Sequence, residues 1–169
     1  MGWNWESYFC FTTVRNPWEM MVSYYHFFKP DINGIYNFER ERNNLNYQAD
    51  QLMTFKDWIL NGSTYHRITL INGKIIKSQW VKGFSKLTLN NTINDINGRS
   101  IVNKIIKAEE IDNELPPLME KLVGIQIASP LVKTNPSIDF NYRDFYDNET
   151  RKIIEKWFQS DIQYGKYKF

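Results

Sequence analysis

The feature that most constrains the fold is an abrupt change of periodicity after Val14. Residues 7–14 (SYFCFTTV) form a continuous β-prone run, typical of a strand covered on both faces in a parallel α/β sheet. Arg15-Asn16-Pro17 follows at once, and apolar residues then recur at helical spacing, namely Trp18, Met21, Val22, Tyr25 and Phe28. The sequence therefore predicts a strand that passes directly into a helix, with an arginine at the junction.

The expected helix has a recognisable start. Asn16 can cap it with its side chain, and Pro17 suits the first turn, where a backbone N–H is not needed. Glu19 stands three residues after Asn16, which is close to a capping box.

The rest of the chain alternates between the same two kinds of element. We expect a strand at 101–108 and helices at 52–60, 114–125 and 147–162. Pro116 and Pro117 are expected in the opening turn of their helix. Residues 30–50 are expected to form a long excursion or loop, and residues 76–84 either a helix or an extended segment. Alternating strands and helices indicate an α/β layer fold. Two strands are too few for a complete sheet, so either further strands lie in the middle of the chain or part of the sheet is absent from it.

Composition narrows the function classes. A chain of 169 residues is expected to form one domain. The net charge of +2, with dispersed Lys and Arg, permits an anionic ligand but gives little support to nucleic-acid binding. No apolar run approaches a membrane helix and no signal peptide opens the chain, so we expect a soluble, cytoplasmic protein without a membrane partner. One cysteine, two histidines and scattered carboxylates predict no metal site.

Arg15 is the first candidate binding residue. Ligands of parallel α/β sheets bind beyond the carboxyl ends of the strands, and Arg15 leaves its strand there. The positive end of the following helix points to the same place, which suits a phosphate. Ser23 lies on that helix, in a stripe with Glu19 and His26, where its hydroxyl could hold a second phosphate oxygen. The same residues also fit an ion pair of Arg15 with Glu19 or with a C-terminal carboxylate, and Ser23 as a small residue at a helix contact.

These residues carry a family resemblance. Arg15-Asn16-Pro17 followed by Ser23-Tyr24-Tyr25 resembles the 3′-phosphate-binding motif of sulfotransferases that use PAPS (3′-phosphoadenosine 5′-phosphosulfate). In that family an arginine ends a strand, a serine eight positions later lies in the next helix, and both hold the 3′-phosphate. Arg15 and Ser23 have this spacing.

The C-terminal part is similar to the ending of bacterial and carbohydrate sulfotransferases, where a tyrosine-arginine pair precedes the last helix. The matching strings are Tyr142-Arg143-Asp144-Phe145-Tyr146-Asp147, Glu149-Thr150-Arg151 and Asp161-Ile162. Residues 105–111 (IIKAEEI) resemble the family's strand that ends in a basic residue and a glutamate, with Glu109 as the counterpart. The family's phenylalanine-glycine-tyrosine tail is displaced by one residue here, to Tyr164-Gly165-Lys166-Tyr167.

The resemblance implies a P-loop NTPase-like three-layer parallel sheet with flanking helices, in a single sulfotransferase-like domain over residues 1–169. It implies transfer of a sulfuryl group from PAPS, as co-substrate, to a hydroxyl acceptor, a carbohydrate being one such acceptor. Arg15 and Ser23 would bind the cofactor, and Tyr142 and Arg143 would lie on the cofactor or acceptor side. No metal enters the implied mechanism.

The chain departs from the family at its start. The family's P-loop and catalytic base precede the arginine motif, but only 14 residues precede Arg15 and none forms such a loop. Gly73-Lys74 and Lys82-Gly83-Phe84-Ser85 lack the spacing or context of a P-loop. No catalytic residue can be assigned, and His26 sits where related enzymes carry a histidine that is not the base. We therefore expect the C-terminal portion of an enzyme, incomplete at the N-terminus.

Two alternatives remain open from the sequence. The first is a truncated, non-catalytic module that binds a nucleotide or forms a homo-oligomer, burying the apolar surface left by missing strands. The second is a generic nucleotide-phosphate binder, similar to a kinase remnant. Unlike a sulfotransferase, it would not distinguish nucleotides by their 3′-phosphate.

Overall fold

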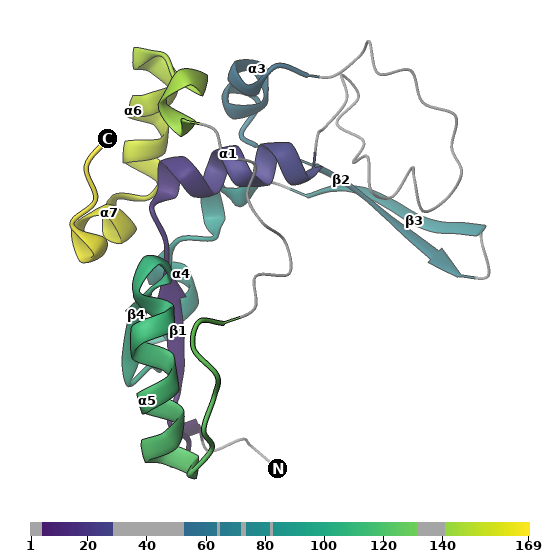
Figure 1. Cartoon of the computed structure of the whole chain (residues 1–169). Helices are drawn as coiled ribbons and strands as arrows, with labels where there is room; N and C mark the ends of the chain where they lie inside the picture. Colours follow the sequence, from purple (N-terminus) through teal and green to yellow (C-terminus); the bar gives the residue numbers. More distant parts are fainter. Residues whose placement is uncertain (1–4, 29–52, 64, 72–73, 82, 132–140) are drawn as a thin grey trace.

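The computed structural model describes residues 5–28, 53–63, 65–71, 74–81, 83–131 and 141–169 (Figure 1). The expected excursion over 30–50 lies outside the described residues, as do Gly73 and Lys82. The elements, in chain order, are η1 (Trp5–Ser7), β1 (Phe11–Val14), α1 (Pro17–Phe28), α3 (Phe55–Leu60), β2 (Tyr65–Ile71), β3 (Lys74–Val81), η3 (Phe84–Lys86), α4 (Leu89–Ile93), β4 (Lys104–Lys107), η4 (Ala108–Glu110), α5 (Ile111–Val123), η5 (Tyr142–Phe145), α6 (Asn148–Trp157) and α7 (Gln159–Gly165). The chain is mixed α/β, as the sequence indicates.

Two small sheets are formed. Strands β1 and β4 pair in parallel, with Phe11 opposite Lys104 and Val14 opposite Lys107, and α5 runs beside them (Figure 1). The second predicted strand is thus confirmed within 101–108. Strands β2 and β3 form an antiparallel hairpin that projects away from the helices (Figure 1). Most of 76–84 is therefore extended rather than helical.

The prediction that residues 7–14 form a strand covered on both faces is wrong. Only Phe11–Val14 are a strand, and the side chains of Tyr8, Phe9 and Phe11 are 57%, 44% and 40% exposed. Val14, at the end that leads into α1, is only 3% exposed. Within the described residues β1 pairs with β4 alone. A sheet of two strands offers few neighbouring side chains that could cover the apolar residues of 7–14. The apolar residues of 7–14 give the segment its β propensity, whereas the burial of their side chains depends on neighbours that lie far away in the sequence.

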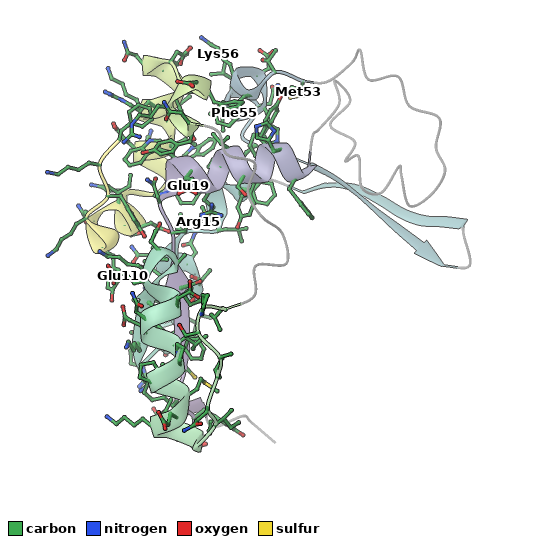
Figure 2. The ribbon with its side chains drawn as sticks, viewed as in Figure 1. Arg15, Glu19, Met53, Phe55, Lys56 and Glu110 are labelled. Carbon is green, nitrogen blue, oxygen red and sulfur yellow. The ribbon has the colours of Figure 1, made fainter. Side chains whose placement is uncertain are left out.

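The core lies where α1, α3 and α6 meet. Its fully buried members include Met21 and Val22 of α1, Trp58 and Ile59 of α3, and Ile154 of α6. Each such side chain contributes about 1.5–3 kcal/mol through burial. Phe55 and Met53 lie on the side of α3 that faces α1 (Figure 2), where the Tyr25 hydroxyl donates to the Met53 carbonyl at 2.7 Å. This packing fixes α1, and with it the residues at the end of β1.

Helix α5 begins earlier than the sequence predicts. It starts at Ile111, so Pro116 and Pro117 lie in its second turn rather than its first. Proline has no N–H, so the carbonyl of Asp112, four residues before Pro116, loses its helical donor. The Ser129 hydroxyl donates to that carbonyl at 3.2 Å instead. The replacement donor comes from beyond the helix, so local rules could not place it.

The single helix predicted over 147–162 is two helices, α6 and α7, divided at Phe158. Phe158 has φ −111° and ψ 31° and is fully buried in the core. After this turn the carboxylate of Asp161 accepts the Leu89 N–H at 3.0 Å, which joins α7 to α4. Burial raises the pKa of Asp161. Core packing and this tertiary hydrogen bond therefore override the helical pattern.

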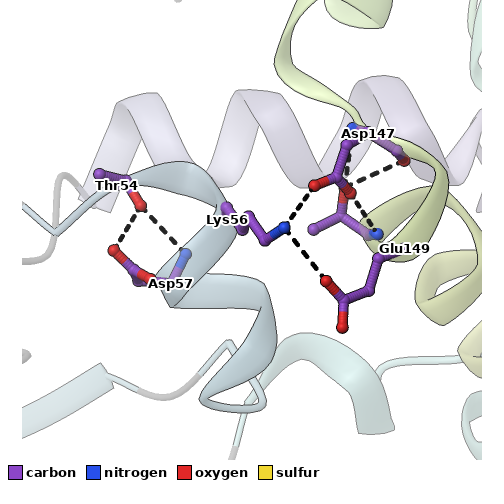
Figure 3. A network of polar contacts seen from close by, with 6 residues as sticks. Thr54, Lys56, Asp57, Asp147 and Glu149 are labelled. Atoms are coloured by element: carbon purple, nitrogen blue, oxygen red, sulfur yellow. Dashed lines mark hydrogen bonds and ion pairs between the residues drawn. The ribbon is translucent and has the colours of Figure 1, made fainter.

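The start of α6 is tied to α3 by charge (Figure 3). Asp147, one of the two candidates that the sequence offers with Asn148, caps α6 and forms a capping box with Thr150. The Lys56 ammonium lies 2.6 Å from the Asp147 carboxylate and 3.1 Å from that of Glu149. The hydrogen bond from Lys56, followed by that from the Thr150 N–H, holds the pKa of Asp147 well below its usual value.

This network gives a pH prediction. A depressed carboxyl pKa contributes stability that is present above the unfolded pKa, about 3.9, and is lost as pH falls toward the folded pKa. Asp147→Asn keeps a capping side chain but does not titrate, so its urea midpoint is expected to depend less on pH below about pH 5 than that of the native chain. Lys56→Gln, which keeps the Thr150 bonds, is expected to lie between the two. Urea titrations over this range would contradict the assignment if all three proteins responded in parallel.

Candidate functional site

Arg15 directly follows the last residue of β1, at the carboxyl end of the β1–β4 pair. Its guanidinium Nη2 lies 2.6 Å from Oε1 of Glu19, and the two side chains are 31% and 37% exposed (Figure 2). The ion pair that the sequence left open is therefore present. Partly exposed i,i+4 pairs contribute only about 0.3–0.5 kcal/mol. A doubly charged phosphate could therefore displace Glu19 at little cost.

Ser23 lies one turn beyond Glu19 on α1, and Arg15, two residues before the helix begins, reaches the first turn through its ion pair with Glu19. Ser23 is half-buried, and its hydroxyl has no hydrogen-bond partner in the part of the chain that the structure describes. Glu19 stands four residues after Arg15 and four before Ser23, and its carboxylate already occupies the Arg15 guanidinium. An anion bridging those two residues would therefore take the place of this carboxylate.

Asn16 joins three elements. Its side-chain oxygen accepts the Trp18 N–H at 3.1 Å, which confirms it as a cap of α1. Its backbone N–H donates to Oε1 of Glu109 at 3.1 Å, while Glu19 is engaged with Arg15, so the expected capping box with Glu19 is wrong. A carboxylate from beyond β4 thus performs the role that the sequence assigned within α1, and it fixes the backbone next to Arg15.

The C-terminal residues close over the same junction. The Tyr167 hydroxyl lies 2.9 Å from Oε2 of Glu109 and 3.3 Å from the Val14 carbonyl, and it can donate its one proton to either. Burial and then the hydrogen bond to Glu109 raise the pKa of Tyr167. Since Glu109 also holds Asn16, the tail, β4 and the start of α1 form one connected unit.

Tyr142 and Arg143 also meet this unit. The Asn16 side-chain amide donates to the Tyr142 hydroxyl at 3.4 Å, which brings η5 beside α1. The Arg143 guanidinium lies over the Tyr142 ring, 4.6 Å from its centroid, and 5.8 Å from that of Phe169. The structure therefore brings Tyr142 next to the residue that follows Arg15, with Arg143 stacked beyond it.

The surroundings of Arg15 are aromatic. Burial raises the pKa of Tyr24, and the nearby positive charge of Arg15 partly opposes this shift. Tyr24 in turn stacks on Phe84, with ring centroids 4.5 Å apart. The His26 ring packs edge-on against Phe145 and Tyr25, at 5.1 and 5.6 Å. This packing gives His26 a structural role in the aromatic cluster between α1 and η5.

Tyr167 is the residue at this junction that sequence reasoning did not assign. Tyr167 stands one residue further from the glycine than the tyrosine of the family's tail, so the resemblance did not identify it. The signal that could have found it is an aromatic residue two positions after Gly165, a spacing that permits close packing. Glu109 was assigned by resemblance, but its bond to the Asn16 N–H was not. Both contacts join residues more than 50 positions apart in sequence.

Among the described residues, no helix is long and apolar enough to cross a membrane. The same residues contain no cluster of three or more His, Cys, Asp or Glu side chains that could hold a metal ion. Comparison of the chain with protein-family models, with curated proteins and with solved structures finds no match in any of the three.

Proposed function

We propose that residues 1–169 form a sulfotransferase-like domain that binds the 3′-phosphate of PAPS with Arg15 and Ser23. In this proposal the β1–β4 pair belongs to a P-loop NTPase-like three-layer sheet. The reaction is transfer of a sulfuryl group to a hydroxyl acceptor, of which a carbohydrate is one class. The P-loop and catalytic base of such an enzyme are not assigned to any residue of this chain.

One observation carries the proposal. A parallel strand ends, an arginine follows it at once, and a helix begins two residues later, carrying a serine hydroxyl for which the described residues offer no hydrogen-bond partner. A guanidinium and a hydroxyl are both phosphate ligands, and the N-terminus of α1 adds positive potential. The groups present therefore fit a phosphate monoester.

The residues around Arg15 have supporting roles in this proposal. Glu109 and Tyr167 hold the backbone at Asn16 and Val14, so that Arg15 leaves the strand in a fixed direction. Tyr142 and Arg143 supply an aromatic face and a positive charge on the cofactor or acceptor side. PAPS, when bound, supplies the activated sulfuryl group, and the chain supplies binding and orientation.

Calorimetric titration with 3′,5′-adenosine bisphosphate tests the proposal. The native chain is expected to bind it more tightly than adenosine 5′-phosphate, which lacks the 3′-phosphate. Arg15→Ala is expected to weaken binding roughly 10- to 100-fold, the value of one charged hydrogen-bonding group. Glu19→Gln is expected to strengthen it, because the competing carboxylate is removed.

Arg99→Ala is the matched control. Arg99 also forms an i,i+4 ion pair, with Asp95 at 3.0 Å, but it lies in a turn after α4. Its replacement should leave nucleotide affinity unchanged. Equal affinity for the two nucleotides would favour a generic nucleotide-phosphate binder. No binding by the native chain would leave Arg15 as a purely structural residue.

A second candidate, a dimerising module, is favoured by exposed apolar side chains at the start of β1 and just before it. Phe11 begins the strand and Phe9 precedes it by two residues, and they are 40% and 44% exposed. Phe9 also lines a hollow of about 470 Å³ with Leu118 and Leu122 of α5. An apolar surface of this kind is often covered by a second chain.

Sedimentation velocity tests this second candidate. The native chain is expected to sediment as a dimer, and Phe9→Glu as a monomer, because a charge in an apolar interface remains unpaired. Phe27→Glu, at a 54% exposed phenylalanine of α1, should leave the dimer intact. A monomeric native chain would exclude this role for β1.

A further inference from the structure

A second hollow, of about 710 Å³, lies between the last two helices and the C-terminal residues. Its lining combines aromatic rings with amines and amides. The lining residues are Trp18, Lys152, Glu155, Lys156, Gln159, Ile162, Gln163, Tyr167, Lys168 and Phe169. Trp18 is only 2% exposed and forms the floor, whereas the three lysines are exposed and form the rim.

The rim carries uncompensated positive charge. Lys152, Lys156 and Lys168 make no ion pair with any carboxylate in the described parts of the chain. Glu155, the acidic side chain of the lining, lies 3.5 Å from Nε of Arg151 and is already paired, and the α-carboxylate of Phe169 adds one further negative charge to the lining. Lys152 and Lys156 are one helical turn apart on α6 and repel each other. An anion between them would relieve that repulsion.

Trp18 contributes its ring to the floor of the hollow. Its indole Nε1–H is buried beneath that surface and has no acceptor among the described residues, so this group does not reach a ligand in the hollow. The wall formed by Phe169 packs edge-on against Trp18 at 5.5 Å, and the Arg151 guanidinium lies 5.4 Å from the Phe169 centroid. Arg151 is paired with Glu155, so the positive charge of the hollow comes from the lysine rim.

The rings define the other part of the ligand. Tyr167 and Phe169 are half-buried, so each still exposes part of its ring in the hollow. Exposed aromatic surface of this kind pairs favourably with another planar ring. Gln159 and Gln163, one turn apart on α7, add amide groups that can form hydrogen bonds with polar substituents of the ligand.

We propose that this hollow binds a small ring-bearing oxyanion, a phosphate or sulfate monoester, through the lysine rim and the rings of Tyr167 and Phe169. The site uses neither Arg15 nor Ser23, so it is additional to the proposed 3′-phosphate site and does not rest on it. Tyr167 borders both, since its ring lines the hollow while its hydroxyl meets Glu109 and Val14.

Calorimetric titration of the full chain with phenyl phosphate, phenyl sulfate and inorganic phosphate tests this site. Phenyl phosphate is expected to bind more tightly than inorganic phosphate, because only the ester offers a ring. Its affinity should fall steeply with added salt. Tighter binding of phenyl phosphate than of phenyl sulfate would identify charge, rather than shape, as the discriminating property.

The double variant Lys152→Gln/Lys156→Gln is expected to lose phenyl phosphate affinity at least roughly tenfold, since both amines contact the anion. Both side chains are exposed, and a thermal melt verifies that the variant remains folded. Lys121→Gln, at an exposed lysine of α5 in the other hollow, is the control and should bind as the native chain does.

The outcomes separate this site from the one at Arg15. Arg15→Ala should keep phenyl phosphate binding, and the double lysine variant should keep its preference for 3′,5′-adenosine bisphosphate. Failure of phenyl phosphate to bind the native chain would overturn the proposal. So would equal loss in Lys121→Gln, abolition by Arg15→Ala, or affinity no greater than that for inorganic phosphate.

Discussion

Gly165→Ala is expected to lower the free energy of unfolding by about 2–3 kcal/mol, the cost of overpacking a closely packed position. A Cβ at this buried glycine would overlap the Tyr167 ring, whose Cζ would lie 2.6 Å away with two other ring atoms closer still. The ring cannot turn aside without losing the Tyr167 hydroxyl contacts with Glu109 and Val14. Urea unfolding followed by circular dichroism measures the loss.

The cause of that loss can be isolated. Tyr167→Phe keeps the ring and removes only the hydroxyl, for which about 1 kcal/mol is expected. Tyr167→Ala removes the ring itself, so adding Gly165→Ala to it should cost much less than adding it to the native chain. Additive effects of these two substitutions would show that the overlap with Tyr167 is not the cause.

Loss of tail docking should also reach the candidate site. Tyr167 and Asn16 share the Glu109 carboxylate, so displacing the Tyr167 ring frees one of its oxygens and loosens the backbone beside Arg15. Gly165→Ala is therefore expected to lower the affinity for 3′,5′-adenosine bisphosphate in addition to lowering the free energy of unfolding. Unchanged affinity in a folded Gly165→Ala protein would mean that the tail stabilises the chain without positioning Arg15.

Gly83→Ala is expected to have the larger effect on stability, about 3–4 kcal/mol. A Cβ there would overlap the Gly62 carbonyl oxygen and would lie 2.6 Å from both the backbone oxygen and Oγ of Ser63. Two of these atoms are backbone and cannot rotate away. Gly83 leads into η3, whose Phe84 packs on Trp58 in the core, so any shift would disturb the core.

Gly124→Ala provides the comparison. Gly124 ends α5 with φ +69°, and a Cβ there would meet nothing within 4 Å. Its replacement should cost only the backbone strain of a left-handed residue, about 1 kcal/mol. The difference between the free energies of unfolding of the two variants, obtained from urea titrations, measures how much the close approach at Gly83 contributes. If Gly83→Ala were no more destabilising than Gly124→Ala, that close approach would not be a feature of the folded chain.

Local rules were sufficient for several elements. The strand before Arg15, the Asn16 cap, the strand within 101–108 and the Asp147 cap all follow from residues within about one turn of one another. The choice between two roles for Arg15 was also visible in the spacing. The sequence could not choose between them, because an ion pair with Glu19 and a phosphate site both use the Arg15 guanidinium at the start of α1.

Contacts over long distances in sequence decided the rest. They include the Glu109 carboxylate that serves Asn16, the tail that docks through Tyr167, and the replacement donor at Ser129 that lets α5 begin before its prolines. The end of α6 at Phe158 also belongs here, because core packing and the Asp161–Leu89 bond set it.

The sequence by itself determined the alternation of strand and helix and put Arg15 at their junction. Only the tertiary structure decided which carboxylate holds the Asn16 N–H, which part of 7–14 remains exposed, and which cations surround the hollow at Phe169. The physical reason is that propensity, capping and periodicity act over a few residues. Burial and hydrogen-bond satisfaction depend on whichever segments the fold brings together.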